Sequence, residues 1–235
     1  GYVVNTTVRS MEKAEHLKKL PNAESNLNVY VADLLTTGSF DSAVAGCTAV
    51  LHVASPFFVG GNEYTMENLL KPALDGTRNV LESCNKAKVK KVVLTASTAC
   101  MYVWYGSKDE SHVLSEEDWS DEEKIIEAKN WYSHSKIQTE KMAWEFAKGP
   151  NCSFRMAVMN PCLIFGPMLQ PVLNTSCKAI ANCATGAKDE IENSCRAIVD
   201  VRDVARAHIL AMESPLESEI WGKRFLLMED CPHWK

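Results

Sequence analysis

The chain has 235 residues, of which 46% are hydrophobic and 23% are charged. This is the composition of a globular domain, and it excludes disordered, collagen-like and coiled-coil proteins. The net charge of −5 disfavours a nucleic-acid surface, and the apolar runs are far too short to span a membrane. Nine cysteines without a Cys-x-x-Cys pair favour reduced thiols, so we expect a cytoplasmic protein that binds no nucleic acid, membrane or metal.

Short apolar runs alternate with stretches of helical periodicity along the whole chain. In chain order, the pattern predicts a strand over 3–8, a helix over 11–20, a strand over 28–32, a helix over 39–45, a strand over 49–54, a helix over 70–84, a strand over 92–96, a helix over 132–147, a strand over 154–158, a helix over 174–184, a strand over 198–201, a helix over 203–212 and a strand over 225–228. This alternation indicates β-α-β units, and thus an α/β fold with a doubly wound parallel sheet. Ligands of such folds bind at the carboxyl ends of the strands.

Residues 108–124 carry eight acidic side chains. A run of like charges is typical of a solvated surface excursion, and its spacing alone is no evidence for a metal site. We therefore expect this segment to lie on the surface without a site of its own.

Tyr132 and Lys136 are four residues apart in a predicted helix, so they lie on one face of it. A phenol has an ordinary pKa of about 10, and a lysine cation within about 4–6 Å lowers it. Such a pair can exchange a proton with a substrate oxygen. Ser97 follows the strand over 92–96, where its hydroxyl group can hydrogen-bond a substrate carbonyl or merely cap a turn. His134, two residues beyond Tyr132, points elsewhere on the helix, which favours a surface or substrate-pocket position over catalysis.

A strand followed by Ser97, then a helix with Tyr-x-x-x-Lys, resembles the extended short-chain dehydrogenase/reductase superfamily. The motif Asn-Trp-Tyr-x-x-x-Lys at 130–136 narrows the resemblance to the cinnamoyl-CoA reductase and dihydroflavonol 4-reductase-like group. Further matching blocks are 46–56, 160–167, 168–176 and 201–208. Together they span nearly the whole chain.

The resemblance implies that Tyr132 is the proton donor, that Lys136 holds the nicotinamide ribose, and that Ser97 positions the substrate carbonyl. It implies a Rossmann dinucleotide-binding domain over 1–160, followed over 161–235 by a small substrate-binding lobe with the remaining sheet elements. The cofactor contacts that it implies are Arg9, Asp33, Leu34, Val53, Ala54, Ser55, Thr95, Tyr132, Lys136, Pro161, Leu163, Ile164 and Ser176. The substrate contacts that it implies are Phe57, Tyr102 and His134.

Arg9 follows the first predicted strand. An acidic residue at this position of a dinucleotide fold binds the ribose 2′-hydroxyl group, whereas an arginine suits a 2′-phosphate, so the expected cofactor is NADP(H). A surface arginine without a ligand is the simpler alternative. Asp33 follows the next strand, where the family contacts adenine, although by itself it is equally a turn residue.

The expected function is NADPH-dependent reduction of a carbonyl or an acyl-CoA thioester. One alternative is a dihydroflavonol, aldehyde or ketone reductase of the same group. Another is a non-catalytic NADP-binding sensor or scaffold, against which the complete set of Ser97, Tyr132 and Lys136 argues. None of the eleven glycines forms the Gly-x-x-Gly-x-x-Gly turn that holds a pyrophosphate, so we expect the first βα unit of the fold to be missing from this chain.

Overall fold

The computed structural model describes residues 1–56, 65–103, 111–187 and 193–233. Its strands are β1 (Val4–Val8), β2 (Leu27–Val31), β3 (Ala49–His52), β4 (Lys91–Thr95), β5 (Arg155–Pro161), β6 (Leu163–Phe165), β7 (Ile198–Asp200) and β8 (Arg224–Leu227). Its α-helices are α1 (Ala23–Asn26), α2 (Asp41–Val44), α3 (Met66–Lys86), α4 (Glu122–Glu127), α5 (Trp131–Lys148), α6 (Thr175–Ala184) and α7 (Val201–Glu213). Short 3-10 helices are η1 (Met11–Ala14), η2 (Leu17–Lys19) and η3 (Thr98–Cys100).

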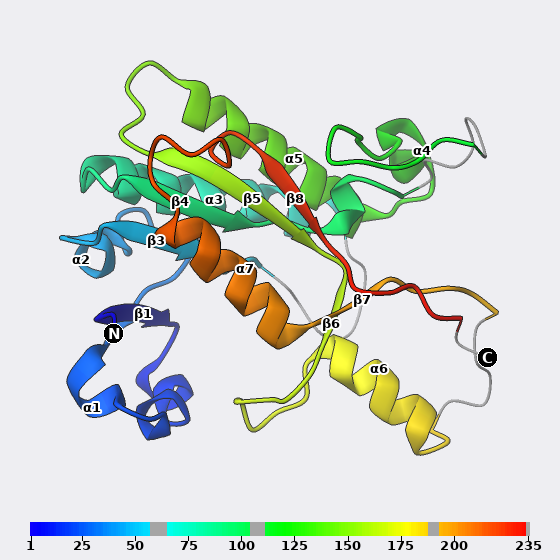
Figure 1. Cartoon of the computed structure of the whole chain (residues 1–235), viewed down its shortest axis with the longest axis horizontal. Helices are drawn as coiled ribbons and strands as arrows, with labels where there is room; N and C mark the ends of the chain where they lie inside the picture. The colour runs from blue at the N-terminus through cyan, green and yellow to red at the C-terminus, as the bar shows by residue number, and fades with distance from the viewer. Residues whose placement is uncertain (57–64, 104–110, 188–192, 234–235) are drawn as a thin grey trace.

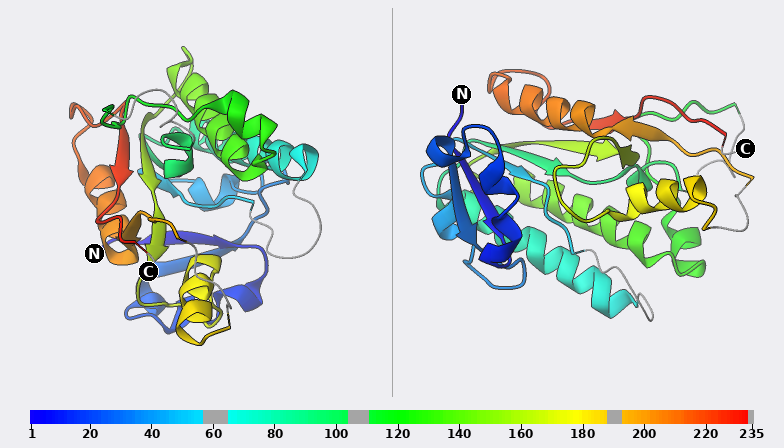
Figure 2. Two further views of the ribbon diagram at one scale, coloured as in Figure 1. Left: turned by 90° about the vertical axis from the view of Figure 1, so that its right-hand side faces the viewer. Right: turned by 90° about the horizontal axis from the view of Figure 1, so that it is seen from below.

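The central sheet contains four parallel strands in the order β3-β4-β5-β8. Helices α3 and α5 cover one of its faces and α7 covers the other (Figures 1 and 2). Successive β4 side chains alternate between these layers: Val92 and Leu94 pack with α3 and α5, whereas Val93 packs with α7. Strands buried on both faces are typical of a parallel sheet between helices. The arrangement confirms the predicted doubly wound α/β fold.

Strands β1 and β2 form a separate parallel pair, which lies below the central sheet in Figure 1. Within the described residues, no strand pairing joins β1 to β3. Side chains hold the pair in place instead. Asn5 of β1 donates from Nδ2 to the Ala43 carbonyl oxygen of α2 at 2.8 Å, and Asn79 of α3 donates from Nδ2 to the Leu34 carbonyl oxygen at 2.7 Å.

The last part of the chain contributes to two regions. Strands β6 and β7 pair in parallel, and α6 lies beside them, away from the central sheet (Figure 1). The chain then returns, because α7 packs under the sheet and β8 pairs with β5. The described residues after β5 therefore divide between the β6–β7–α6 region and the central sheet, and a substrate-binding lobe stays a prediction.

The predicted helix over 11–20 is wrong, since this segment forms the two 3-10 turns η1 and η2. Its apolar residues are spaced three apart, at Met11, Ala14, Leu17 and Leu20. A 3-10 helix has three residues per turn, so this spacing suits short 3-10 turns better than an α-helix. Ala14 is the one that becomes buried.

The acidic segment is more ordered than a solvated excursion, because its described part contains α4. The Asp121 carboxylate caps this helix by accepting from the Lys124 backbone nitrogen at 3.2 Å. Ile125 is fully buried in the core, and Glu122 pairs with Lys141 of α5 at 2.5 Å. A buried side chain directly after the charge run and an ion pair therefore hold this part of the segment against α5.

Candidate active site

Ser97 and Tyr132 meet at the carboxyl end of β4. The Ser97 backbone nitrogen donates to Oδ1 of Asn160 at 3.2 Å, which holds the turn after β4 against β5. The Ser97 hydroxyl oxygen also accepts from the Ala99 backbone nitrogen at 3.2 Å and so caps η3. The same hydroxyl group lies close enough to the Tyr132 phenol to lower the pKa of the phenol. Ser97 is therefore both a turn cap and a neighbour of the tyrosine.

Lys136 lies one helical turn beyond Tyr132 and reaches the end of β3. Its Nζ atom donates to Oγ of Ser55 at 3.2 Å. Burial lowers the pKa of Lys136, while the nearby Cys100 and Glu140 side chains oppose this change. Two sequence-predicted residues, Ser55 and Lys136, are thus in direct contact.

The pKa of Tyr132 differs from the sequence-based expectation. Burial of the phenol is the largest cause of its raised pKa, Cys100 and Tyr102 raise it further, and the Ser97 hydroxyl group opposes them. The expected lowering of the pKa by Lys136 is not found in this arrangement, where burial of the phenol dominates. The phenol of Tyr132 is therefore held in its protonated form at neutral pH, while 36% of the residue stays exposed.

Thr95 is oriented by a hydrogen bond to α7. Its Oγ1 atom lies 2.7 Å from Nε2 of His208, and Nδ1 of the same ring lies 2.7 Å from the Val204 carbonyl oxygen. A carbonyl oxygen only accepts, so Nδ1 carries the proton and Nε2 accepts from the threonine. Burial lowers the pKa of His208, in agreement with a neutral ring. The hydroxyl proton of Thr95 is thus committed to His208.

The predicted substrate contacts have different positions. Tyr102 is 41% exposed and lies close enough to Tyr132 to raise its pKa. His134 is buried, with Nδ1 at 3.6 Å from Oε1 of Glu122 and its ring edge-on to Trp131. Of the two positions predicted for His134, at the surface or in a substrate pocket, burial excludes the surface, and its contact with a substrate stays a prediction. Phe57 lies outside the described residues.

Arg9 and Asp33 form a second group at the carboxyl ends of β1 and β2. The parallel register ends at Val8 opposite Val31, and the Ala32 backbone nitrogen donates to the Val8 carbonyl oxygen at 3.0 Å. Arg9 directly follows the first of these strand ends, and Asp33 follows the second by two residues. Both are exposed, and within the described part of the chain Arg9 makes no ion pair. An unpaired guanidinium beside a strand end fits a phosphate group.

The other expected cofactor contacts lie at neighbouring strand ends. Val53 and Ala54 follow β3 and are exposed, and Leu34 packs so closely on α3 that a Cβ atom at Gly76 would be 2.9 Å from the Leu34 Cβ atom. Four further residues follow along the β5–β6–α6 path: the buried Pro161, and the half-buried Leu163, Ile164 and Ser176.

Asn160 is a further candidate that the sequence patterns did not identify, and it lies beside Ser97. It is fully buried at the end of β5, and among the described residues its Nδ2 atom has no hydrogen-bond partner. A buried polar group without a partner is unfavourable, so an acceptor from a bound molecule would stabilise it. This orphaned donor fits a dinucleotide site at the strand ends. A polar residue inside the apolar run over 156–162 was the signal that could have identified it.

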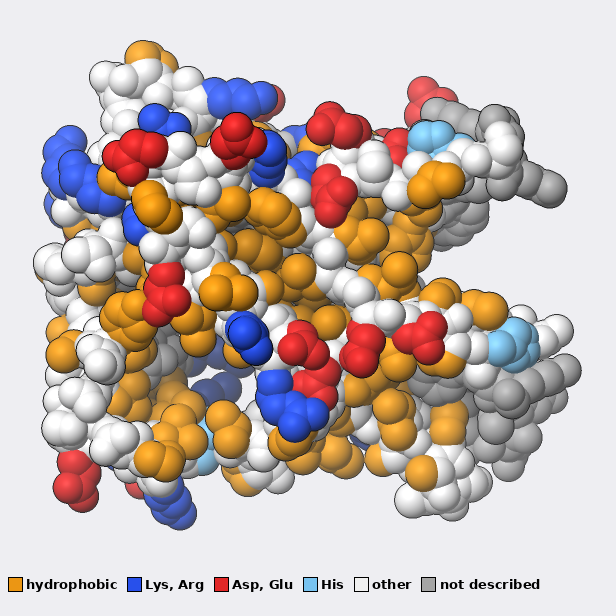
Figure 3. Space-filling model, viewed as in Figure 1, with side chains coloured by type: hydrophobic (Ala, Val, Ile, Leu, Met, Phe, Trp, Pro, Cys, Tyr) orange, Lys and Arg blue, Asp and Glu red, His pale blue; other side chains and the backbone are white. Residues whose placement is uncertain are grey.

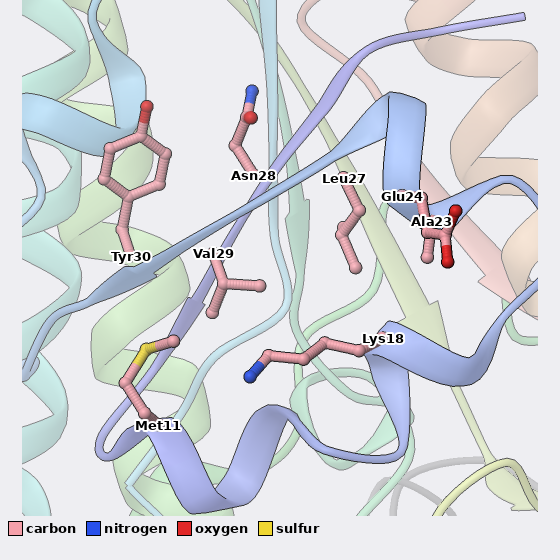
Figure 4. A pocket seen from close by; sticks show the side chains of 8 residues that line it. All are labelled: Met11, Lys18, Ala23, Glu24, Leu27, Asn28, Val29 and Tyr30. Carbon is pink, nitrogen blue, oxygen red and sulfur yellow. The ribbon is translucent and has the colours of Figure 1, made fainter.

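The surroundings of the site agree with a small-molecule ligand. Figure 3 shows an apolar notch between the segment that carries α4 and the strand β7, on the side where α5 begins in Figure 1. A separate cavity of about 680 Å³ lies between η1, η2 and β2 and shares no residue with the catalytic group (Figure 4). The described residues contain neither a metal-ligating cluster nor a helix with the length and apolarity needed to cross a membrane.

Comparison with known proteins decides the family. The family model described as "NAD dependent epimerase/dehydratase family" matches residues 2–222. The chain belongs to this family. It is 41% identical over 239 residues to the cinnamoyl-CoA reductase CAD2 of Medicago truncatula, which covers all of the chain and 71% of that relative. It is 35% identical over 223 residues to dihydroflavonol 4-reductase of Gerbera hybrida, which covers 92% of the chain and 59% of the relative.

A solved structure gives the same result. The structure of Gre2 from Candida albicans in complex with NADPH matches with a TM-score of 0.80 and 36% identity, over 94% of this chain and 69% of that one. The family, the relatives and this structure confirm the predicted extended short-chain dehydrogenase/reductase of the cinnamoyl-CoA and dihydroflavonol reductase-like group. They also confirm the expected type of protein, an oxidoreductase that uses NADP(H).

Proposed function

We propose that this epimerase/dehydratase-family member reduces a carbonyl group or an acyl-CoA thioester with NADPH, and that Tyr132 is the proton donor. The observation that carries the proposal is the contact of Tyr132 with Ser97 at the end of β4, one helical turn from Lys136. A substrate oxygen next to these two hydroxyl groups would meet an orienting partner and an acid at the same place.

The raised pKa of Tyr132 supports its role as an acid. At neutral pH the buried phenol is protonated, so it can donate to an oxygen on which negative charge develops. Ser97 would orient that oxygen through its hydroxyl group. The positive charge of Lys136, which stands beside Ser55, would favour the phenolate that remains after proton transfer.

Cofactor binding is proposed for the strand ends. Arg9 would hold the 2′-phosphate, Asp33 and Leu34 would lie along the adenine, and Ser55 with Lys136 would bind at the nicotinamide ribose. When bound, the nicotinamide supplies the hydride for the reduction. The unpaired Nδ2 atom of Asn160 supports a ligand at this edge of the sheet.

The substrate is proposed at the level of a class. The relatives named as cinnamoyl-CoA reductases support an aromatic acyl-CoA thioester, and the apolar notch beside the start of α5 suits such a ligand. Dihydroflavonols, aldehydes and ketones are the second candidates. A non-catalytic sensor is less well supported, because it has no need for an acid, an orienting hydroxyl group and a buried cation together.

A substrate panel with the purified protein tests the proposal. Hydroxycinnamoyl-CoA esters, dihydroflavonols, and simple aldehydes and ketones are each mixed with NADPH, and its absorbance at 340 nm is followed. We expect turnover with at least one class and a faster rate with NADPH than with NADH. Tight NADPH binding without oxidation by any member of the panel would favour the sensor.

A further inference from the structure

Glu140 carries a carboxylate with no exposed surface, two helical turns beyond Tyr132 and one beyond Lys136. The three residues are spaced four apart, so they occupy one face of α5. Taking a carboxylate out of water is costly unless other groups pair with it. The side chains that contact the Glu140 carboxylate therefore indicate its role.

Arg224 of β8 is the main partner of Glu140. Its Nε atom donates to Oε1 at 2.6 Å and an Nη atom donates to Oε2 at 3.2 Å, which is a two-point contact between nearly inaccessible side chains. Nε1 of Trp144 adds a donor to Oε1 at 3.2 Å. Such bidentate, charge-assisted contacts fix orientation as well as charge.

The same guanidinium group ties the acidic segment to the catalytic helix. It donates from the other Nη atom to the carbonyl oxygens of Glu116 at 3.1 Å and Asp118 at 2.7 Å. Its plane lies over the ring of Trp119, with Cζ at 3.8 Å from the ring centroid. Arg224 thus joins β8, α5 and the segment before α4.

Glu140 also acts toward the active site. Burial raises the pKa of the Cys100 thiol, in the 3-10 turn that follows Ser97, and the nearby Glu140 carboxylate raises it further. The negative charge of Glu140 opposes the effect of burial on Lys136. The other charged or ionisable groups beside Lys136 and Glu140 are Cys100 on η3, His52 on β3 and Arg224 on β8, whose guanidinium group is bonded to Glu140.

We propose that Glu140 is a positioning residue: clamped by Arg224 and Trp144, it fixes the Cys100 turn against α5 and keeps Lys136 in its cationic form. The proposal rests on the proposed reductase function only for its kinetic consequence. Lys136 needs its positive charge to favour the Tyr132 phenolate, and neither Ser55 nor the thiol supplies a compensating negative charge at neutral pH. Glu140 is the carboxylate that does so.

The variant Glu140→Gln keeps the shape and one acceptor oxygen but removes the charge. We expect the pKa of Lys136 to fall, so that the lysine loses its proton at lower pH. The alkaline limb of the kcat profile then moves to lower pH, and kcat drops by roughly ten-fold, less than the 10²–10⁴-fold typical of a direct proton donor. Glu145→Gln is the matched control, since it makes the same change at an exposed position of the same helix.

A second readout needs no turnover. Titration of the lysine ¹³Cε resonances, with Lys136 identified by its loss in Lys136→Met, measures the ionisation directly. An unchanged Lys136 midpoint in Glu140→Gln overturns the proposal, whereas a shifted midpoint in a protein without reductase activity supports it and rejects the function.

The double variant Glu140→Leu/Arg224→Met separates positioning from folding. Replacement of a buried ion pair by apolar residues often restores stability. For a positioning role, we expect the melting temperature to recover while the Lys136 midpoint stays low. The pair serves only the fold if the melting temperature and the Lys136 midpoint both recover in the double variant. The same conclusion follows if the Lys136 midpoint is low in neither Glu140→Gln nor the double variant.

Discussion

The two groups of strand-end residues differ in how they meet water. At the end of β4, Ser97 and Lys136 are half-buried and hydrogen-bonded to protein groups, and burial of its phenol raises the pKa of Tyr132, which keeps 36% of its surface exposed. At the ends of β1 and β2, Arg9 and Asp33 are exposed, on a pair of strands held by side-chain contacts. Proton transfer benefits from a site where burial sets the pKa, whereas recognition of a charged phosphate needs only an accessible cation. The difference separates chemistry from recognition within one site.

The largest expected effect is the loss of kcat on substitution of Tyr132. Tyr132→Phe removes only the hydroxyl group, and because this group is the proposed acid, kcat should fall by about 10²–10⁴-fold. Steady-state kinetics with NADPH measure the loss, and circular dichroism checks that the fold is retained. Tyr30→Phe is the control, since it removes a phenol that lines the separate cavity beside β2 and takes no part in the catalytic group. Equal kcat values for the Tyr132 variant and the unchanged protein would disprove the assignment.

Substitution of the exposed Arg9 should change the affinity for the cofactor. If Arg9 pairs with a 2′-phosphate, Arg9→Ala removes a charge-assisted contact worth about 1.5–3 kcal/mol, or roughly 10- to 100-fold in affinity. Calorimetric titration should show this loss for NADPH and almost none for NADH, which lacks the phosphate. An equal loss for both cofactors would mean that the arginine is structural.

The smallest expected effect concerns His52 and the dependence of the free energy of unfolding on pH. Its ring is buried, and burial together with the charge of Lys136 lowers its pKa to about 4. The unfolded chain, with an ordinary histidine pKa of about 6.5, therefore binds the proton first, and stability is lost as the pH falls from about 6.5 to 4. When the pH is lowered from 7.5 to 5.5, the free energy of unfolding measured with urea should decrease by about 1 kcal/mol more in the unchanged protein than in His52→Gln.

The control for this measurement is His16→Gln, at a half-exposed position of the N-terminal region. It should leave the difference between the two pH values as it is in the unchanged protein. If the free energy of unfolding decreases equally in His52→Gln and in the unchanged protein, the buried His52 ring does not cause the loss of stability at low pH.

The sequence predicted the parts of the site that depend on local geometry. Tyr132 and Lys136 share a helix face because they are four apart, and Ser97 follows a strand of unmistakable apolar character. The pairing of Glu140 with Arg224 joins positions 84 residues apart, and that of Thr95 with His208 spans 113. No local pattern encodes such contacts, because they arise only when α5 meets β8 and β4 meets α7. The direction of the Tyr132 pKa was missed for the same reason: it depends on how deeply the assembled protein buries the phenol.

The attachment of β1 and β2 has a consequence for local stability. Two amides, Asn5 and Asn79, link this pair to α2 and α3, while the central sheet is bonded strand to strand from β3 to β8. Opening of the pair requires the loss of few side-chain contacts and leaves the larger sheet intact. Amide protons of β1 and β2 should therefore exchange with solvent through a sub-global opening, at a lower free energy than those of β4 and β5. The edge that carries Arg9 is then the part of the molecule whose order a bound phosphate could most increase.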